Sequence, residues 1–354
     1  MAELLGIGMP HAPMFQFPDE SMANILKRDL ERGKIPERYR DRSTWPEAMQ
    51  AEWGDDEGLS AARRHRAAVV DGLRKVRAEL DAFQPDFILV FGDDQYENFR
   101  EDVVPPFCVY FFDDMEVLPF RGSSAVGARE NVWGKSPDTK VLVRGHREAG
   151  VRLTTELIQS GFDVAWAMRP HHHPTLGHSF MRTLVYLDYD QQTLPYPMMP
   201  FHVNAYGADI ARSITLDDGQ TLDEAPPAPN PSRCFDLGQA VGRILRESPY
   251  RVAVVGSSSW SHAFLTAKHD LLYPDIDSDR ERLTELEASQ HAGWRNLPLD
   301  QIRDAGQHEL LNWICMAGVM ADARAEVLAF AETYIFNSTK VVALLRETPA
   351  PNGG

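Results

Sequence analysis

Residues 85–95 read PDFILVFGDDQ, and this stretch decides the fold class. Phe87 to Phe91 are all apolar and predict a strand, while Pro85 ends the helix that the apolar spacing predicts from Leu59 to Phe83. Polar residues begin directly after the strand, at Asp93. In open α/β sheets, ligands bind beyond the carboxyl ends of the strands. The stretch therefore predicts both a strand of such a sheet and one side of a functional site.

The same pattern recurs in two other parts of the chain. Leu4 to Gly8 is a short apolar run that leads to His11, and Val252 to Gly256 leads to His262. Glu309 stands at the start of an otherwise apolar helix. Segments far apart in the sequence are thus predicted to bring imidazoles and carboxylates to one edge of a sheet. This arrangement favours a mononuclear metal enzyme.

Helices and strands are predicted to alternate along the rest of the chain, which indicates the α/β class. Further helices are expected at 145–160, 237–247, 277–288, 299–305 and 307–320, further strands at 104–113, 162–168, 182–189 and 200–204, and a loop at 114–140. Residues 14–58 are rich in charge, proline and tryptophan, and are predicted to run over the surface and cover the site. The Pro-rich segment 225–231 is interpreted as a loop, and the residues from 348 as a flexible tail.

The composition restricts the class of protein. The 354 residues include 43% hydrophobic ones and carry a net charge of −16, which argues against nucleic acids and anionic membranes as partners. No apolar run approaches the roughly 18 residues of a membrane span, and the N-terminus lacks the features of a signal peptide. Cys108, Cys234 and Cys315 are too widely spaced for a zinc ribbon and too few for a disulfide framework. We therefore expect a cytoplasmic enzyme, with one large domain or two smaller ones.

Three candidate residues each allow two interpretations. The prolines that flank His11 fix its backbone, so it is either a ligand or catalyst, or a loop histidine with a structural hydrogen bond. Glu309 is either a buried carboxylate that binds a metal, or an acid in a solvent-facing first turn. His262 ends a run of small residues and is a candidate general base, or merely caps the loop. A serine hydrolase is disfavoured because the G-x-S-x-G motif is absent here.

Other polar clusters are less specific. For the densest histidine cluster, His171 to His173, a solvated loop is the simplest interpretation. His178 follows Gly177 and is a better candidate for a site. Asp93 and Asp94 could bind Mg²⁺ or orient histidines.

Four segments match a known pattern in order and spacing over nearly the whole chain. They are Gly6–Met14 (GIGMPHAPM), Leu176–His178 (LGH), Gly256–His262 (GSSSWSH) and His308–Trp313 (HELLNW). Together they resemble the class III (LigB-type) extradiol ring-cleavage dioxygenases. That family includes the catalytic subunit of protocatechuate 4,5-dioxygenase and the gallate and 3-O-methylgallate dioxygenases.

The resemblance implies one domain over residues 1–354, with a central mixed β-sheet flanked by helices. It also implies Fe(II) held by His11, Glu309 and a second histidine, whose place in this sequence is taken by Gln95. Gln95 is therefore the expected third ligand, with Asp94 and His178 as alternatives. By the same resemblance, His262 is the acid–base catalyst, and His178 is a catalytic residue that hydrogen-bonds the substrate or oxygen.

We therefore predict a non-haem Fe(II) dioxygenase that inserts O2 into a small catechol- or gallate-like aromatic and opens its ring. One alternative is a metal-dependent hydrolase or lyase on the same scaffold, and another is a metal-free binding protein that kept the fold. The expected partners are the aromatic substrate and O2, in a homo-oligomer, with a small partner subunit left open. Nucleic acids and membranes are not expected as partners.

Overall fold

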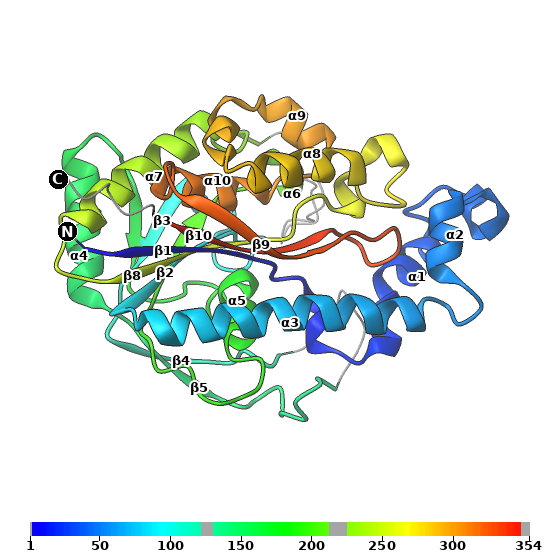
Figure 1. Cartoon of the computed structure of the whole chain (residues 1–354), viewed down its shortest axis with the longest axis horizontal. Coiled ribbons are helices and arrows are strands. Elements are labelled where there is room, and N and C mark those ends of the chain that lie inside the picture. The colour runs from blue at the N-terminus through cyan, green and yellow to red at the C-terminus, as the bar shows by residue number, and fades with distance from the viewer. Residues whose placement is uncertain (1, 122–129, 212–224, 348–354) are drawn as a thin grey trace, which may run out of the picture.

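An eight-stranded mixed sheet lies at the centre of the computed structural model, which describes residues 2–121, 130–211 and 225–347 (Figure 1). The strands lie in the order β6-β3-β7-β2-β8-β1-β10-β9. Their bounds are β1 Leu4–Met9, β2 Phe87–Gly92, β3 Phe107–Tyr110, β6 Ala165–Ala167, β7 Met198–Val203, β8 Val252–Ser257, β9 Arg324–Ala331 and β10 Lys340–Arg346. A separate hairpin pairs β4 (Asp114–Val117) with β5 (Val141–Arg144).

Four neighbouring strands at the centre of the sheet are parallel. β8 pairs with β1 on one side and β2 on the other, and β2 pairs with β7. At the two flanks, β3 pairs antiparallel with β7, and β10 pairs antiparallel with β1. The predicted α/β class with a central mixed sheet is therefore confirmed. The carboxyl ends of β1, β8, β2 and β7 meet at one edge of the sheet, where a ligand site is expected.

Helices cover both faces of the sheet, which explains why its central strands are continuous apolar runs. Ile88 and Val90 of β2 belong to the core on the side of α3 and α5, and Leu89 and Phe91 to the core on the side of α7 and α10 (Figure 1). The helices are α1 Asn24–Glu31, α2 Glu47–Trp53, α3 Leu59–Phe83, α4 Arg147–Gln159, α5 His178–Leu187, α6 Ala208–Ala211, α7 Pro231–Arg246, α8 Ile276–Glu287, α9 Leu299–Asp304 and α10 Leu310–Val319. Short 3-10 helices span Pro13–Gln16, Asp19–Ser21, Glu37–Arg40, Arg42–Thr44, Ala263–Leu265, Ala267–His269 and His291–Asn296.

Two glycines let α10 approach the sheet closely. A Cβ atom on Gly8 would lie 2.1 Å from the ring of Trp313, and one on Gly256 would lie 3.1 Å from the Cα of Trp313. The indole nitrogen of Trp313 donates a hydrogen bond to the carbonyl oxygen of Ser258 (3.1 Å). The start of α10, where Glu309 occupies the N-cap position, is thereby held at the carboxyl edge of the sheet.

Residues 14–58 contain more structure than their composition suggested. They include α1 and α2, which lie at the right-hand end of Figure 1. Met14, Phe15, Met49 and Trp53 from this stretch are buried in the same core cluster as residues of α3 and the sheet. The stretch is therefore anchored by apolar packing, and its role as a cover for the site stays a prediction.

Two parts of the predicted secondary structure are wrong. Residues 182–189 do not form a strand, since most of them belong to α5. All but one of the α5 residues from Ser179 to Leu187 are buried, and a helix and a strand are hard to distinguish by spacing in such a short apolar run. The predicted loop 114–140 contains β4, and β5, β9 and β10 were not predicted. The predicted tail from 348 lies outside the described residues. In the described part of the chain, no helix combines the length and the apolar character that crossing a membrane requires.

Candidate metal centre

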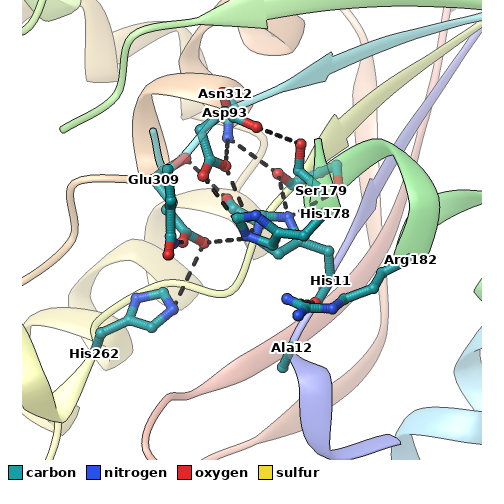
Figure 2. A network of polar contacts seen from close by, with 12 residues as sticks. His11, Ala12, Asp93, His178, Ser179, Arg182, His262, Glu309 and Asn312 are labelled. Carbon is teal, nitrogen blue, oxygen red and sulfur yellow. Dashed lines mark hydrogen bonds and ion pairs between the residues drawn. The ribbon is translucent and has the colours of Figure 1, made fainter. Parts of the chain in front are cut away.

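Polar side chains from five segments meet at the carboxyl edge of the parallel strands (Figure 2). His11 follows β1, Asp93 follows β2, and His262 follows β8. Glu309 comes from the start of α10, and His178 from the start of α5. The structure thus brings these distant segments to one edge of the sheet, as the apolar runs and their polar ends predicted.

His11 is buried, and the surroundings of both ring nitrogens are defined. Nδ1 lies 3.1 Å from the carbonyl oxygen of Ser257 and 3.1 Å from its Oγ. When Nδ1 donates its proton to that carbonyl, the Nε2 lone pair faces Oε2 of Glu309 at 3.2 Å and Oδ1 of Asp93 at 3.7 Å. Burial lowers the pKa of His11, but the charges of Glu309 and Asp93 outweigh it and raise the pKa above its usual value.

Asp93 is fully buried beside a second carboxylate. Nδ2 of Asn312 donates hydrogen bonds to Oδ1 of Asp93 (3.0 Å) and to the carbonyl oxygen of Ser257 (3.1 Å). Oδ2 of Asp93 has no hydrogen-bond partner, and Nε2 of His178 lies 3.9 Å from it. Burial, reinforced by the charge of Glu309, raises the pKa of Asp93 to about 8. A cation beside Asp93 would offset both effects.

Glu309 is only 1% exposed, which excludes the solvent-facing turn considered from the sequence. Its Oε1 accepts hydrogen bonds from the hydroxyl of Tyr206 and from Nε2 of Gln95 (3.3 Å). Its Oε2 lies at ion-pair distance from His11 (3.2 Å) and His262 (3.6 Å), but no aligned hydrogen bond reaches it. Burial by itself raises the pKa of Glu309, but the charges of His262 and His11 lower the pKa by a larger amount. The net shift is downward, and the carboxylate stays charged.

His178 is the first residue of α5, and Glu97 holds it in place. The ring Nδ1 lies 2.8 Å from Oε2 of Glu97, and the backbone N–H of His178 donates to the same oxygen (2.8 Å). Burial raises the pKa of Glu97, but His178 lowers it overall to about 2. Nδ1 therefore donates to a carboxylate, and Nε2 is left to face Asp93. Histidines that bind metals are commonly oriented by such a carboxylate.

Four of these side chains form what we call the buried group: His11, Asp93, His178 and Glu309. One ligand atom from each lies within 4.8 Å of those of the other three. Oδ2 of Asp93 and Oε2 of Glu309 are buried without hydrogen-bond partners, which is costly unless a cation is present. Imidazole nitrogen and carboxylate oxygen are ligands that divalent transition metals accept. The residues present therefore fit a divalent metal ion.

His262 lies at the edge of the buried group with its ring orientation fixed. Its Nδ1 is 2.9 Å from the carbonyl oxygen of Trp260, so a proton on Nδ1 leaves Nε2 as the acceptor that faces Glu309. Burial lowers the pKa of His262. The preceding residue, Ser261, donates its backbone N–H (3.1 Å) and its hydroxyl to the buried carboxylate of Asp279. These contacts make His262 a positioned, neutral imidazole near neutral pH.

The three candidates for the third metal ligand, Gln95, Asp94 and His178, have different surroundings. Nε2 of Gln95 donates to the hydroxyl of Tyr206 (2.7 Å) and to the carboxylate of Glu309. Gln95 therefore contacts the buried group through Glu309. Asp94 accepts hydrogen bonds from the backbone N–H groups of Glu97 (2.8 Å) and Asn98 (3.0 Å), which occupy its oxygens in a turn. Of the three, His178 is the one whose ligand atom belongs to the buried group.

Several residues at the site were missed in the sequence or given too little weight. Asp93 directly follows a fully apolar strand, and that position was the available signal for it. Tyr206 and Glu97 act through contacts between distant segments, which no local pattern reveals. Arg182 lies one turn after His178 on α5 and donates to the carbonyl oxygen of His11 (3.3 Å). It was assigned to a strand, which hid its position on the same helix face as His178.

Comparisons with known proteins identify relatives of this chain. Residues 221–342, which include His262 and Glu309, match the family described as the catalytic LigB subunit of aromatic ring-opening dioxygenase. Over 240 residues the chain is 27% identical to a 2,3-dihydroxyphenylpropionate/2,3-dihydroxicinnamic acid 1,2-dioxygenase of Comamonas testosteroni. The chain is therefore similar to LigB-type dioxygenases, both in this family match and in its relatives. Over 196 residues it is 29% identical to a second 2,3-dihydroxyphenylpropionate/2,3-dihydroxicinnamic acid 1,2-dioxygenase, from Pseudomonas putida.

These matches cover only part of each LigB-type relative. The alignments span 68% of this chain and 61% of the Comamonas protein, and 55% and 49% for the Pseudomonas protein. The chain thus matches about half to three fifths of the length of these two relatives. Among solved structures, an uncharacterized protein from Escherichia coli K12 aligns over 78% of this chain and 91% of its own, with a TM-score of 0.45 and 13% identity.

Proposed function

We propose that this LigB-type protein is an extradiol ring-cleavage dioxygenase that opens the ring of a small catechol- or gallate-like aromatic with O2. The observation that carries the proposal is the buried group. Its two imidazole Nε2 atoms, fixed through Nδ1, face two buried carboxylates that each have an oxygen without a hydrogen-bond partner. The names of the relatives support the reaction class, since they are described as dioxygenases of dihydroxylated aromatic acids.

The metal that we propose is Fe(II), held by His11, His178 and Glu309. These two histidines and one carboxylate would hold the ion, which would supply binding of the catechol hydroxyls and of O2. This assignment differs from the resemblance, which implied Gln95 as the third ligand and His178 as a hydrogen-bonding residue. His178 becomes a ligand, and Gln95 becomes the residue that, with Tyr206, orients the Glu309 carboxylate.

His262 is the proposed acid–base residue. The carbonyl of Trp260 holds the proton on Nδ1, so the Nε2 lone pair is available to accept a proton from a substrate hydroxyl. Burial keeps the ring neutral near neutral pH, which is the form that a base requires. The same nitrogen can later return the proton, because burial lowers the pKa of His262 and disfavours the protonated ring.

Arg182 is the proposed contact for an acidic group on the substrate. Among the described residues no ion pair satisfies its guanidinium, although Glu97, Glu309 and Asp93 all act on it electrostatically. The substrates named for the two relatives carry a carboxylate beside the catechol hydroxyls. A guanidinium fits a carboxylate with two parallel hydrogen bonds. We therefore propose a catechol with an acidic substituent.

We also propose a single domain, a cytoplasmic location and a homo-oligomer. One domain is supported by the sheet, whose strands come from both ends of the described chain, from Leu4 to Arg346. The three free cysteines, Cys108, Cys234 and Cys315, support a location in the cytoplasm, where thiols stay reduced. A homo-oligomer, with or without a small partner subunit, is testable by light scattering of the purified protein.

A metal-dependent hydrolase is the second candidate, because the buried group contains two carboxylates. Asp93 and Glu309 together offer a more oxygen-rich set than a facial triad needs, and such sets also suit metals that activate water. The two candidates differ in their need for O2. A hydrolase would act on its substrate under nitrogen.

The test is oxygen uptake by the Fe(II)-loaded protein with 2,3-dihydroxyphenylpropionate and with unsubstituted catechol. We expect one O2 consumed for each ring opened, and a lower KM for the acidic substrate. An Arg182→Lys variant should lose most of this preference while it retains its metal. No O2 uptake with any dihydroxylated aromatic acid, in protein whose metal is bound, would refute the proposed reaction.

A further inference from the structure

A second cluster of metal-ligating side chains lies outside the buried group. Asp102 is in the segment that follows β2, and His171 and His172 precede α5. Nε2 of His172 lies 2.9 Å from Oδ1 of Asp102, and Nε2 of His171 lies 3.3 Å from Oδ2. One ligand atom from each residue lies within 4.8 Å of those of the other two. We call these three residues the exposed group.

The convergence of the two imidazoles is not what a solvated histidine run normally gives. Side chains of adjacent residues in an extended chain point in opposite directions. Here the chain bends, and His171 and His172 meet edge to face with ring centroids 4.2 Å apart. Each ring then approaches a different oxygen of the same carboxylate.

We propose that Asp102, His171 and His172 form a second binding site for a divalent transition metal, with Zn²⁺ as the representative ion. Two imidazoles and one carboxylate, with water in the remaining position, are a known ligand set for zinc. Ligand atoms about 2.0–2.1 Å from one tetrahedral ion lie roughly 3.3 Å apart, close to the observed nitrogen–oxygen distances. The net charge of −16 favours cations at the surface of this protein.

The position of the exposed group suggests what a bound ion would do. The segment from Asp93 to Asp102 and the segment from His171 to His178 are already joined by hydrogen bonds, at Glu97 and at Asn98. Asn98 donates to the carbonyl oxygen of Thr175 (3.3 Å) and accepts from the backbone N–H of His173 (3.3 Å). An ion between Asp102 and the two histidines would join the same segments from outside. It would therefore stabilise the two segments that carry Asp93 and His178.

The exposed group is accessible, so its residues can be replaced without disturbing the core. The side chains of Asp102, His171 and His172 are 44%, 66% and 31% exposed. His173 provides a matched control, because it is adjacent in sequence but its Nδ1 contacts the carbonyl oxygen of Thr175 (3.1 Å) instead of Asp102. The His173→Asn variant can keep a hydrogen-bond donor near the Thr175 carbonyl and removes the imidazole.

The experiment is calorimetric titration of the metal-stripped full chain with Zn²⁺. We expect two binding events in the unaltered protein. The double variant His171→Ala/His172→Ala should lose only the weaker binding event. Glu309→Gln should lose only the tighter binding event. The control His173→Asn should keep both. In the Glu309→Gln background, Zn²⁺ should raise the melting temperature, and adding His171→Ala/His172→Ala should abolish that rise.

Three results would overturn the proposal. The first is two unchanged events in the double variant. The second is loss of the weaker event in His173→Asn, which would indicate nonspecific binding to a histidine-rich loop. The third is a single event in the unaltered protein that Glu309→Gln abolishes. Each result concerns zinc binding alone. The second metal site can therefore be refuted while the dioxygenase function holds, and the dioxygenase function can be refuted while the second metal site holds.

Discussion

The buried group and the exposed group offer the same kinds of ligand but differ in what holds the ligands. In the buried group each histidine has a partner for its second nitrogen: Ser257 for His11 and Glu97 for His178. In the exposed group, both histidines form ion pairs with Asp102, which is itself a proposed ligand. The first arrangement is fixed in advance of any ion, whereas the second depends on the ion to hold it.

This difference sets what each group can do. Ligands that are fixed before binding lose little conformational entropy when the ion arrives, so the ion binds more tightly. Buried oxygens without hydrogen-bond partners also gain more from a cation than solvated ones do. A catalytic ion is therefore expected in the buried group, and a weaker, stabilising ion in the exposed group.

The largest expected effect comes from Glu309→Gln, which would break the buried group. The variant removes a negative charge at the ligand atoms, and metal affinity at this site should fall by more than roughly 100-fold, the upper end of what loss of a supporting residue costs. Oxygen uptake should be lost with it. Metal content after dialysis and circular dichroism provide the measurements. Asp102→Asn is the control and should keep both the metal of the buried group and the activity. Full occupancy of the buried group in Glu309→Gln would show that Glu309 is not a ligand.

The next effect separates proton transfer from metal binding within the buried region. His262→Ala should keep its metal and its affinity for substrate, while turnover falls by roughly 10²–10⁴-fold, as expected for a lost general acid–base. The readouts are metal content, kcat and KM. If the variant lost its metal, His262 would belong to the ligand set. If turnover changed little, His262 would only cap its loop.

A smaller effect is expected from Gln95→His, which tests how far the ligand set extends. Gln95 donates to the Glu309 carboxylate and to Tyr206, so the larger ring should displace these contacts. Fe(II) affinity should then fall by roughly 10-fold, the cost of disturbing a ligand's support. Tighter Fe(II) binding would instead place residue 95 at the ion, as the sequence resemblance suggested.

An effect of a different kind, on stability, concerns burial without a metal, at Lys340 of β10. Its amine is buried, donates to the carbonyl oxygens of Phe336 (2.7 Å) and Ser338 (2.5 Å), and burial lowers its pKa to about 7. Between about pH 7 and the ordinary value of 10.5, the unfolded chain binds more protons at Lys340 than the folded chain does. The free energy of unfolding should therefore rise with pH over that range.

Lys340→Met should remove this dependence, and urea denaturation at several pH values measures it. The variant loses two hydrogen bonds, so its stability is offset at every pH, but the slope is the informative quantity. If the free energy of unfolding had the same slope against pH in the two proteins, burial would not lower the pKa of the Lys340 amine.

The sequence predicted the parts of the site that follow from strand ends. The apolar runs before His11, Asp93 and His262 identified β1, β2 and β8, and the apolar helix after Glu309 made burial one of its two interpretations. These signals are local, because a strand buried on both faces must be apolar throughout.

The parts that the sequence did not predict depend on contacts between distant segments. The helix α5 is short and almost entirely buried, so its apolar run could also be interpreted as a strand, and His178 was not recognised as its first residue. The contacts of Glu97 with His178 and of Tyr206 with Glu309 join residues about 80 and 100 positions apart, as no short-range spacing rule could reveal.

Anomalous X-ray diffraction at the iron edge, from crystals of the Fe(II)-loaded protein, tests the central claim most directly. We expect an iron peak among His11, His178 and Glu309, bonded to Nε2 of both histidines and to Oε2 of Glu309. An iron peak elsewhere, with these three side chains still joined only to one another, would contradict it.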